Sequence, residues 1–250
     1  MGTHPGRRSI LARAADIVWP PRSLLSDRIV DRPGAIEAPL WAELRFLARP
    51  LCAACGFPFE TAAEDGALCG ACTAEAPGFA TARAALVYDD HARKLVLDLK
   101  RGGRRDGLKV FAGWMARAGA EALTEADLIA PTPLHWTRLL ERRFNQSAWL
   151  AEAISRASGK PLAVDLLTRR RRRKSQEGLT ASQRRRNVEG VFAMNPPAGR
   201  VAGRIVVLID DVFTTGATAE ACAKALLRAK AAKVHVLTLA RVVRPVDVSI

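Results

Sequence analysis

The segment from Ile205 to Ala240 constrains the fold more than any other part of the sequence. Ile205 to Ile209 is apolar at every position, which is typical of a strand covered on both faces. Thr218 to Lys230 has helical periodicity, and Val234 to Ala240 is a second apolar run. A strand, a helix and a strand within about 35 residues predict a βαβ unit. We therefore expect a parallel sheet with a right-handed crossover.

Weaker patterns predict further elements on the amino-terminal side of this unit. Strands are expected at 84–88 and 128–130, helices at 91–100, 111–123 and 144–158, and a candidate strand at 188–194. A short amphipathic helix is expected at 9–19, because Pro20 and Pro21 follow it. Alternating strands and helices indicate an α/β fold with helices flanking the sheet.

Four of the five cysteines form two closely spaced pairs. Cys52 and Cys55 are separated from Cys69 and Cys72 by thirteen residues, and each pair has two residues between its members. Two thiolates from each of two turns can converge on one tetrahedral Zn²⁺. Four reduced surface thiols are the plain alternative, and a redox CxxC would explain one pair only. The fifth cysteine, Cys222, lies in a helical pattern and is expected in the core.

Polar residues follow the predicted strand that ends at Ile209. Asp210 and Asp211 would lie at the carboxyl end of that strand, where open α/β sheets bind ligands. Thr214 to Thr218 supplies hydroxyls and a glycine just before a helix, so its backbone N–H groups could hold a phosphate. The carboxylates could accept hydrogen bonds from ribose hydroxyls. The plain alternative is that Asp211 and Thr214 only cap the helix.

The formal net charge of +14 is concentrated in one segment. Residues 169–187 contain nine Arg or Lys residues against one Glu, a local charge of +8 by subtraction. Such a segment is either a mobile solvated loop or a contact for phosphate or nucleic acid. No apolar run reaches the roughly 18 residues needed to span a bilayer. We expect a cytoplasmic protein without membrane insertion.

The run from Val206 to Thr218 resembles the motif by which type I phosphoribosyltransferases bind phosphoribosyl pyrophosphate (PRPP). Over residues 45–244 the chain further resembles the ComF family of competence-associated proteins. The stretches that carry this second resemblance are Cys52 to Cys72, Asp127 to Leu134, Arg142 to Gln146, Gln176 to Leu179 and Arg186 to Val188.

The resemblance implies a type I phosphoribosyltransferase-like parallel sheet flanked by helices, with a small N-terminal zinc ribbon. We expect an N-terminal segment with a degenerate zinc module at 1–44, the zinc ribbon at 45–80, the phosphoribosyltransferase-like domain at 81–244 and a tail at 245–250. The acceptor pocket would lie in a hood built from residues 52–103.

The resemblance also implies roles for individual residues. PRPP would bind to Asp210, Asp211, Val212, Phe213, Thr214, Thr215, Gly216, Ala217 and Thr218, with Pro131, Thr132, Pro133 and Leu134 beside the pyrophosphate and Mg²⁺. Residues 214–218 would hold the 5-phosphate, and Asp210 and Asp211 the ribose hydroxyls. Arg142, with some arginines of 169–173, is the candidate for pyrophosphate contacts, the basic loop closing as a lid. We expect Asp210, Asp211 and Arg142 to be catalytic.

The sequence departs from the family pattern near its amino terminus. Where fuller members carry two further cysteine pairs, this chain has Ser23, Ser26, Glu37 and Leu40. Serine and leucine are poor or impossible zinc ligands. We therefore predict one structural zinc held by Cys52, Cys55, Cys69 and Cys72, and a packed, metal-free amino-terminal segment.

The expected function is that of a Mg²⁺-dependent phosphoribosyltransferase acting on PRPP, associated with DNA uptake and natural transformation or with nucleotide salvage. The alternative is a non-catalytic PRPP sensor or competence factor that binds single-stranded DNA through the basic loop 169–187. PRPP is the first expected partner, and single-stranded DNA and competence proteins are the others. That loop contains no aromatic residue on which bases could stack.

Overall fold

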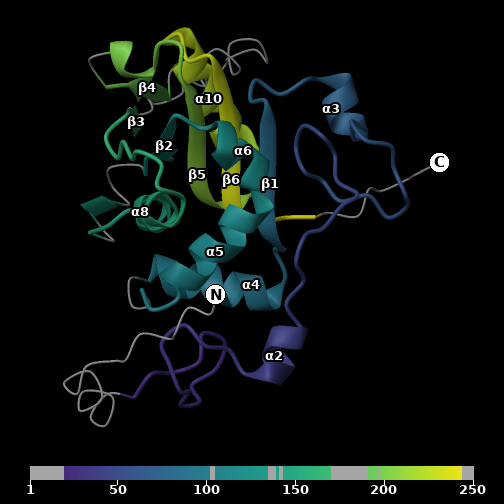
Figure 1. Cartoon of the computed structure of the whole chain (residues 1–250), viewed down its shortest axis with the longest axis vertical. Helices are drawn as coiled ribbons and strands as arrows, with labels where there is room; N and C mark the ends of the chain where they lie inside the picture. Colours follow the sequence, from purple (N-terminus) through teal and green to yellow (C-terminus); the bar gives the residue numbers. More distant parts are fainter. Residues whose placement is uncertain are drawn as a thin grey trace, which may run out of the picture.

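The computed structural model describes residues 20–101, 105–134, 139–140, 143–169, 191–195 and 198–243. At its centre is a four-stranded sheet of order β1-β6-β5-β2, in which every neighbouring pair is parallel (Figure 1). Its strands are β1 (Thr81–Val87), β2 (Leu128–Pro131), β5 (Ile205–Phe213) and β6 (Lys233–Arg241). The predicted βαβ unit is confirmed, with α10 (Ala217–Arg228) connecting β5 to β6.

Strand β5 does not end at Ile209, as the apolar run suggested. It continues to Phe213, with Asp210 opposite Thr238 and Phe213 opposite Arg241 of β6. The apolar pattern stops earlier than the strand because polar residues take over its carboxyl end. The acid pair therefore lies inside a hydrogen-bonded strand, and its backbone is fixed by the sheet.

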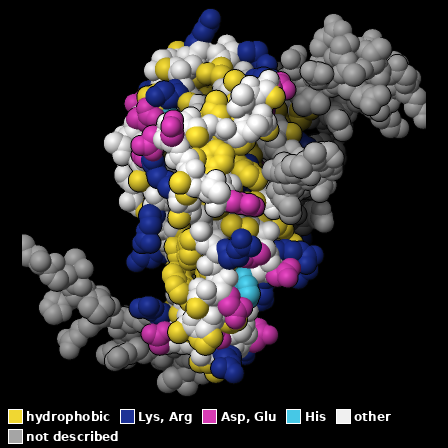
Figure 2. Space-filling view, turned by 90° about the vertical axis from the view of Figure 1, so that its right-hand side faces the viewer, with side chains coloured by type: hydrophobic (Ala, Val, Ile, Leu, Met, Phe, Trp, Pro, Cys, Tyr) yellow, Lys and Arg dark blue, Asp and Glu magenta, His cyan; other side chains and the backbone are white. Residues whose placement is uncertain are grey.

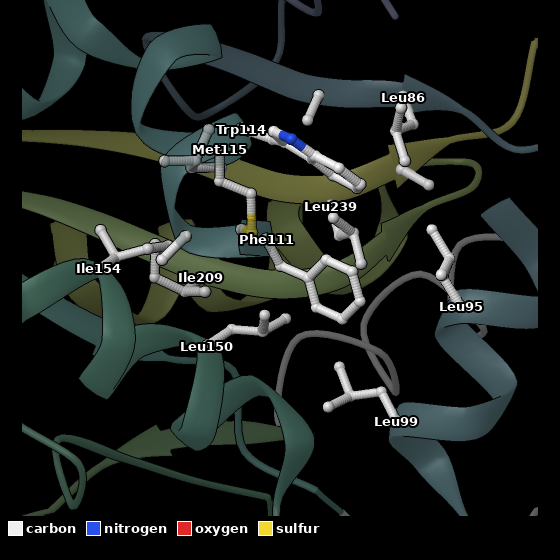
Figure 3. Packing of buried hydrophobic residues seen from close by; sticks show 14 of the residues in the cluster. Leu86, Leu95, Leu99, Phe111, Trp114, Met115, Leu150, Ile154, Ile209 and Leu239 are labelled. Carbon is white, nitrogen blue, oxygen red and sulfur yellow. The ribbon is translucent and has the colours of Figure 1, made fainter. Parts of the chain in front are cut away.

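One face of the sheet is covered by helices that precede β5 in the chain. They are α4 (Asp90–Lys100), α5 (Leu108–Ala118), α6 (Ala120–Glu125) and α8 (Gln146–Ser158). Figure 3 shows how side chains of α4, α5 and α8 meet those of the strands, with Phe111 and Leu150 facing Leu239 and Ile209. The predicted helix at 111–123 is two helices, because Gly119 ends α5.

The other face of the sheet packs against α10, the four paired cysteines and a small antiparallel pair of strands. This pair is β3 (Leu167–Arg169) with β4 (Phe192–Met194), and the 3-10 helix η1 (Ala198–Val201) follows it. β4 falls in the predicted strand at 188–194, whereas β3 was not predicted. Along β5, Val206 and Leu208 face this second core, and Val207 and Ile209 face the first. Both faces are thus covered, as the apolar run predicted.

Two short helices, α2 (Ala38–Ala42) and α3 (Gly70–Ala74), belong to the amino-terminal part of the chain. The helix expected at 9–19 and the tail at 245–250 lie outside the described residues, as does most of the basic segment. None of the helices in the described ranges is long and apolar enough to cross a membrane.

Candidate functional site

The acid pair lies in the carboxyl-terminal part of β5 and is held by hydroxyl groups from neighbouring elements. Ser147 Oγ donates to Asp210 Oδ1 at 2.9 Å, and Thr132 Oγ1 donates to Ser147 Oγ at 3.3 Å. The backbone N–H of Asp211 also donates to Asp210 Oδ1 at 2.9 Å. Burial and the charge of Asp211 nevertheless raise the pKa of Asp210 to about 6. The surroundings of Asp210 therefore oppose the ionisation of its carboxyl group.

Asp211 is the more deeply buried acid, with 6% of its surface exposed. Its Oδ2 atom lies 3.1 Å from Lys100 Nζ and accepts a hydrogen bond from Gln146 Nε2 at 2.8 Å. Lys100 is the last residue of α4, and Gln146 is the first residue of α8. Three elements distant in sequence therefore converge on one carboxylate and fix its position.

The sequence analysis did not identify Lys100. The residue ends an amphipathic helix whose apolar side, with Leu95 and Leu99, packs into the core, and its positive charge suits a helix carboxyl terminus. This role in the helix is enough to explain a lysine at position 100, without any functional site. Only the parallel order of β1 and the strands beside it places the end of α4 next to β5.

The loop after β5 has the geometry of an anion site. Gly216 is the N-cap of α10 with φ +79°, so neither Asp211 nor Thr214 is the N-cap residue and the alternative that they only cap the helix is wrong. The N–H of Ala217 donates a long hydrogen bond of 3.4 Å to Thr215 Oγ1. A Cβ at Gly216 would lie 2.7 Å from a ring carbon of Phe213, so only glycine fits. Residues 214, 215, 217 and 218 are exposed. The N–H groups at the start of this twelve-residue helix therefore face an accessible surface.

The end of β2, whose residues 131–134 were predicted to lie near the pyrophosphate, lies beside the acid pair. Pro131 is opposite Ile209, and the Thr132 N–H donates to the Ile209 carbonyl at 2.9 Å. Asn145 Nδ2 donates to the Thr132 carbonyl at 3.0 Å, which connects this segment to the start of α8. Pro133 and Leu134 follow and are half-buried.

The predicted pyrophosphate cations are not placed. Arg142 and residues 170–173 lie outside the described residues. Arg169 is described and lies in β3, with its guanidinium carbon 5.4 Å from the centre of the Phe192 ring. The structure thus brings the ends of β2 and β5 together with Lys100, and leaves Arg142 as a prediction.

The four cysteines converge as predicted. Their sulfur atoms all lie within 4.8 Å of one another, with Cys55 Sγ 3.6 Å from Cys69 Sγ. A tetrahedral Zn²⁺ with bonds of about 2.3 Å requires sulfur atoms about 3.8 Å apart. Burial raises the pKa of Cys72, and for Cys52 it is outweighed by backbone N–H groups that lower the pKa to about 6. The donor set fits zinc and forms a zinc-ribbon site.

The zinc ribbon is attached firmly to the sheet. Gly56 follows Cys55 with φ +71°, and a Cβ there would lie 2.4 Å from the carbonyl oxygen of Ala82. The absence of a side chain lets the turn lie directly on β1. From β6, the guanidinium of Arg241 donates to the carbonyl oxygen of Cys55 and lies 3.5 Å from its sulfur. The metal site and the end of the central strands are therefore in contact.

The segment that lacks cysteines is held by hydrogen bonds. The hydroxyls of Ser23 and Ser26 donate to the two carboxylate oxygens of Glu37. These hydrogen bonds lower the pKa of Glu37. Three of the four positions at which the family pattern would place zinc ligands thus form a hydrogen-bonded cluster, and the fourth, Leu40, packs against the core.

Two family models match parts of this chain. A model of the "Double zinc ribbon domain" matches residues 14–77, and a model of the "Phosphoribosyl transferase domain" matches residues 145–246. A solved structure of glutamine PRPP amidotransferase from B. subtilis is 22% identical, with a TM-score of 0.40, over 56% of this chain and 30% of that chain.

Similar curated proteins carry names connected with DNA utilization or with competence. "DNA utilization protein YhgH" of Escherichia coli O157:H7 is 32% identical over 198 residues, 77% of this chain and 85% of that protein. "Competence protein F" of Haemophilus influenzae is 32% identical over 115 residues, covering 46% of this chain and 50% of that protein. "Competence protein ComFC" of Bacillus subtilis is 29% identical over 161 residues, 64% of this chain and 63% of that protein. With its zinc ribbon and phosphoribosyltransferase-like domain, this chain belongs to the ComF family of competence-associated proteins.

Proposed function

We propose that this protein binds PRPP with Mg²⁺ at the carboxyl edge of the sheet and acts as a phosphoribosyltransferase in DNA uptake or nucleotide salvage. The observation that carries the proposal is the acid pair. Asp210 and Asp211 are fixed by donors from α4 and α8, directly before a loop and helix start suited to a phosphate. Thr132 at the end of β2 donates in turn to Ser147. Burying carboxylates costs free energy, and apolar residues would pack better at both positions. Packing therefore does not explain the acid pair.

The chemistry of transfer explains the arrangement. Displacement of pyrophosphate from the anomeric carbon leaves positive charge on the sugar and negative charge on the leaving group. Carboxylates that accept hydrogen bonds from the ribose hydroxyls would stabilise the charge on the sugar. Residues 131–134 would lie beside the pyrophosphate, and Mg²⁺, held mainly by substrate oxygens, would offset its charge. Lys100 limits the repulsion between the acid pair and the phosphates.

Ligand-induced stabilisation tests the proposal. PRPP with Mg²⁺ should raise the melting temperature of the zinc-loaded protein, because a ligand that binds only the folded state stabilises it. The shift should disappear in the Asp210→Asn, Asp211→Asn double variant. Asp90→Asn, which changes an exposed acid at the start of α4, is the matched control and should keep it. A shift of equal size in all three proteins would contradict the assignment of the acid pair.

A second candidate is a competence factor that binds single-stranded DNA through residues 169–187. The names of the similar proteins and the local charge of +8, nine basic residues minus one acid, favour it. On the side of the zinc ribbon, described Lys and Arg residues are interspersed with Asp and Glu (Figure 2). Binding through the basic segment should weaken steeply with salt, whereas PRPP binding should respond mainly to Mg²⁺. Measuring the affinity for an oligonucleotide at two salt concentrations distinguishes the two candidate functions.

A further inference from the structure

Arg241 is a buried cation at the end of β6, between the zinc ribbon and the loop assigned above to phosphate. Only 7% of the residue is exposed. Within the described ranges, no carboxylate lies close enough to form an ion pair with its guanidinium. A buried cation needs a compensating negative charge, because an unpaired charge away from water costs free energy. The four cysteines of the zinc ribbon are the candidate source of that charge.

The guanidinium of Arg241 contacts the zinc ribbon at Cys55. Its Nη1 donates to the Cys55 carbonyl oxygen, and its Nη2 lies 3.5 Å from Cys55 Sγ. Cysteines bind zinc as thiolates, so four of them outweigh the charge of one Zn²⁺ and leave the centre negative. With zinc bound, the Cys55 turn is therefore fixed and presents Arg241 with both a hydrogen-bond acceptor and an anionic partner.

The same guanidinium packs against the aromatic ring that supports the phosphate loop. Its central carbon lies 4.7 Å from the centre of the Phe213 ring and 5.4 Å from that of Phe57. Phe213 is buried as well, and its ring meets that of Phe79 edge to face with the centroids 6.0 Å apart. A guanidinium over an aromatic face is attracted to the ring. Arg241 and Phe79 thus fix the orientation of Phe213.

Phe213 in turn determines where the phosphate loop can lie. Gly216, the N-cap of α10, is so close to this ring that a Cβ would lie 2.7 Å from Phe213 Cζ. The backbone is tied at the same place, because the Val242 N–H donates to the Phe213 carbonyl at 2.9 Å. A shift of the Phe213 ring would therefore move Gly216 and the N–H groups that follow it.

We infer that Arg241 couples zinc binding by the ribbon to phosphate binding by the loop 214–218. Arg241 is a positioning residue, because it acts on the loop through Phe213 and touches no substrate. The inference rests on the phosphate site of the proposed function and adds a regulation of that site, in which the loop binds phosphate tightly only when the ribbon holds its metal. Coupling between two sites is reciprocal, so bound phosphate should also tighten zinc binding by the same factor.

Competition with a zinc chelator tests the inference, with ribose 5-phosphate as the probe for the loop. The zinc affinity of the full-length protein is measured without the sugar phosphate and at a saturating concentration of it. In the parent, ribose 5-phosphate should raise the zinc affinity about fivefold or more, the lower end of typical coupling between sites. In the Arg241→Met variant this factor should fall below about twofold, because the contacts from Cys55 to Phe213 are lost.

Arg83→Met is the matched control. Arg83 Nη2 donates to the Ala53 carbonyl oxygen at 3.0 Å, so this arginine also holds the cysteine turn to the sheet, but it does so from β1 and none of its described contacts involves Phe213. The control should keep the factor of the parent even where it binds zinc more weakly. Arg241→Lys is the second test variant. It keeps the charge but lacks the planar group that contacts the carbonyl and both rings, so it should lose the coupling too.

The outcomes separate the inference from the proposed function. Ribose 5-phosphate that binds the zinc-loaded parent without changing its zinc affinity would overturn the inference and leave the phosphate site standing. A factor that survives in the Arg241 variants, or that Arg83→Met also removes, would overturn it as well, because the coupling would then run through the stability of the whole ribbon. If calorimetry detects no binding of ribose 5-phosphate or PRPP to the zinc-loaded parent, the phosphate site itself is wrong and both proposals fall. Melting temperatures show whether each variant is folded.

Discussion

Replacing Asp210 by asparagine should make the folded protein more stable while it damages the site. The folded-state pKa of Asp210 is raised from 3.8 to about 6, first by burial and then by the charge of Asp211. The difference, 6 minus 3.8, is about two, and each pKa unit corresponds to about 1.4 kcal/mol. Ionised Asp210 thus destabilises the folded state by up to about 3 kcal/mol. Asparagine can keep an oxygen for the Ser147 hydroxyl and carries no charge.

The direction of the Asp210 pKa shift determines how the stability gain of the variant depends on pH. A raised folded-state pKa means that the penalty is absent below the unfolded pKa of 3.8, grows as pH rises, and is complete above about 6. The Asp210→Asn variant should therefore exceed the parent in free energy of unfolding by about 1–3 kcal/mol near pH 8 and by about half as much near pH 5.

Urea denaturation of both proteins at the two pH values, with zinc present, measures this difference. Asp90→Asn is again the control and should change stability by less than about 0.5 kcal/mol. A variant that is no more stable than the parent near pH 8, or whose gain does not shrink near pH 5, would refute the argument. The first result would mean that the surrounding donors fully compensate the buried charge, and the second that the gain has a cause other than the charge of Asp210.

Three further predictions concern other parts of the chain. Lys100→Met leaves the buried carboxylate of Asp211 without its cation. The variant should therefore have a free energy of unfolding lower by about 1–3 kcal/mol and weaker PRPP binding. Urea denaturation measures the first effect and calorimetry the second. Gly216→Ala combines a left-handed backbone with a clash against Phe213, so it should cost about 1 kcal/mol or more and impair phosphate binding, as denaturation and titration with ribose 5-phosphate would show. Metal analysis should find one zinc per chain in the parent, and two in a variant that has cysteine at all four degenerate positions, Ser23, Ser26, Glu37 and Leu40.

Local sequence patterns predicted the parts of the fold whose residues follow a regular period or spacing. The apolar run of β5 and the helical period of α10 fixed the parallel unit, and the spacing of the cysteines predicted their convergence. The end of β5 was predicted four residues early, because Asp210 to Phe213 break the apolar pattern while still pairing with β6. The end of this strand is determined by pairing with the neighbouring strand, and a local sequence pattern carries no information about that pairing.

The residues around the acid pair show the same limit. Asp210, Asp211 and Thr132 follow apolar runs and could be predicted as site residues from their position. Lys100 and Ser147 look like ordinary helix residues, and only the order of strands brings them within hydrogen-bonding distance of the acids. The hydrogen bond of Arg241 to the zinc ribbon likewise depends on a contact between β6 and a turn far away in the chain.

The central claim is that the edge of the sheet formed by β2 and β5 binds PRPP. Its most direct test is calorimetric titration of PRPP into the zinc-loaded full-length protein, with and without Mg²⁺. The proposed site predicts saturable binding of about one PRPP per chain that weakens strongly when Mg²⁺ is removed. No binding at millimolar PRPP, in protein shown to be folded and to contain zinc, would contradict the claim.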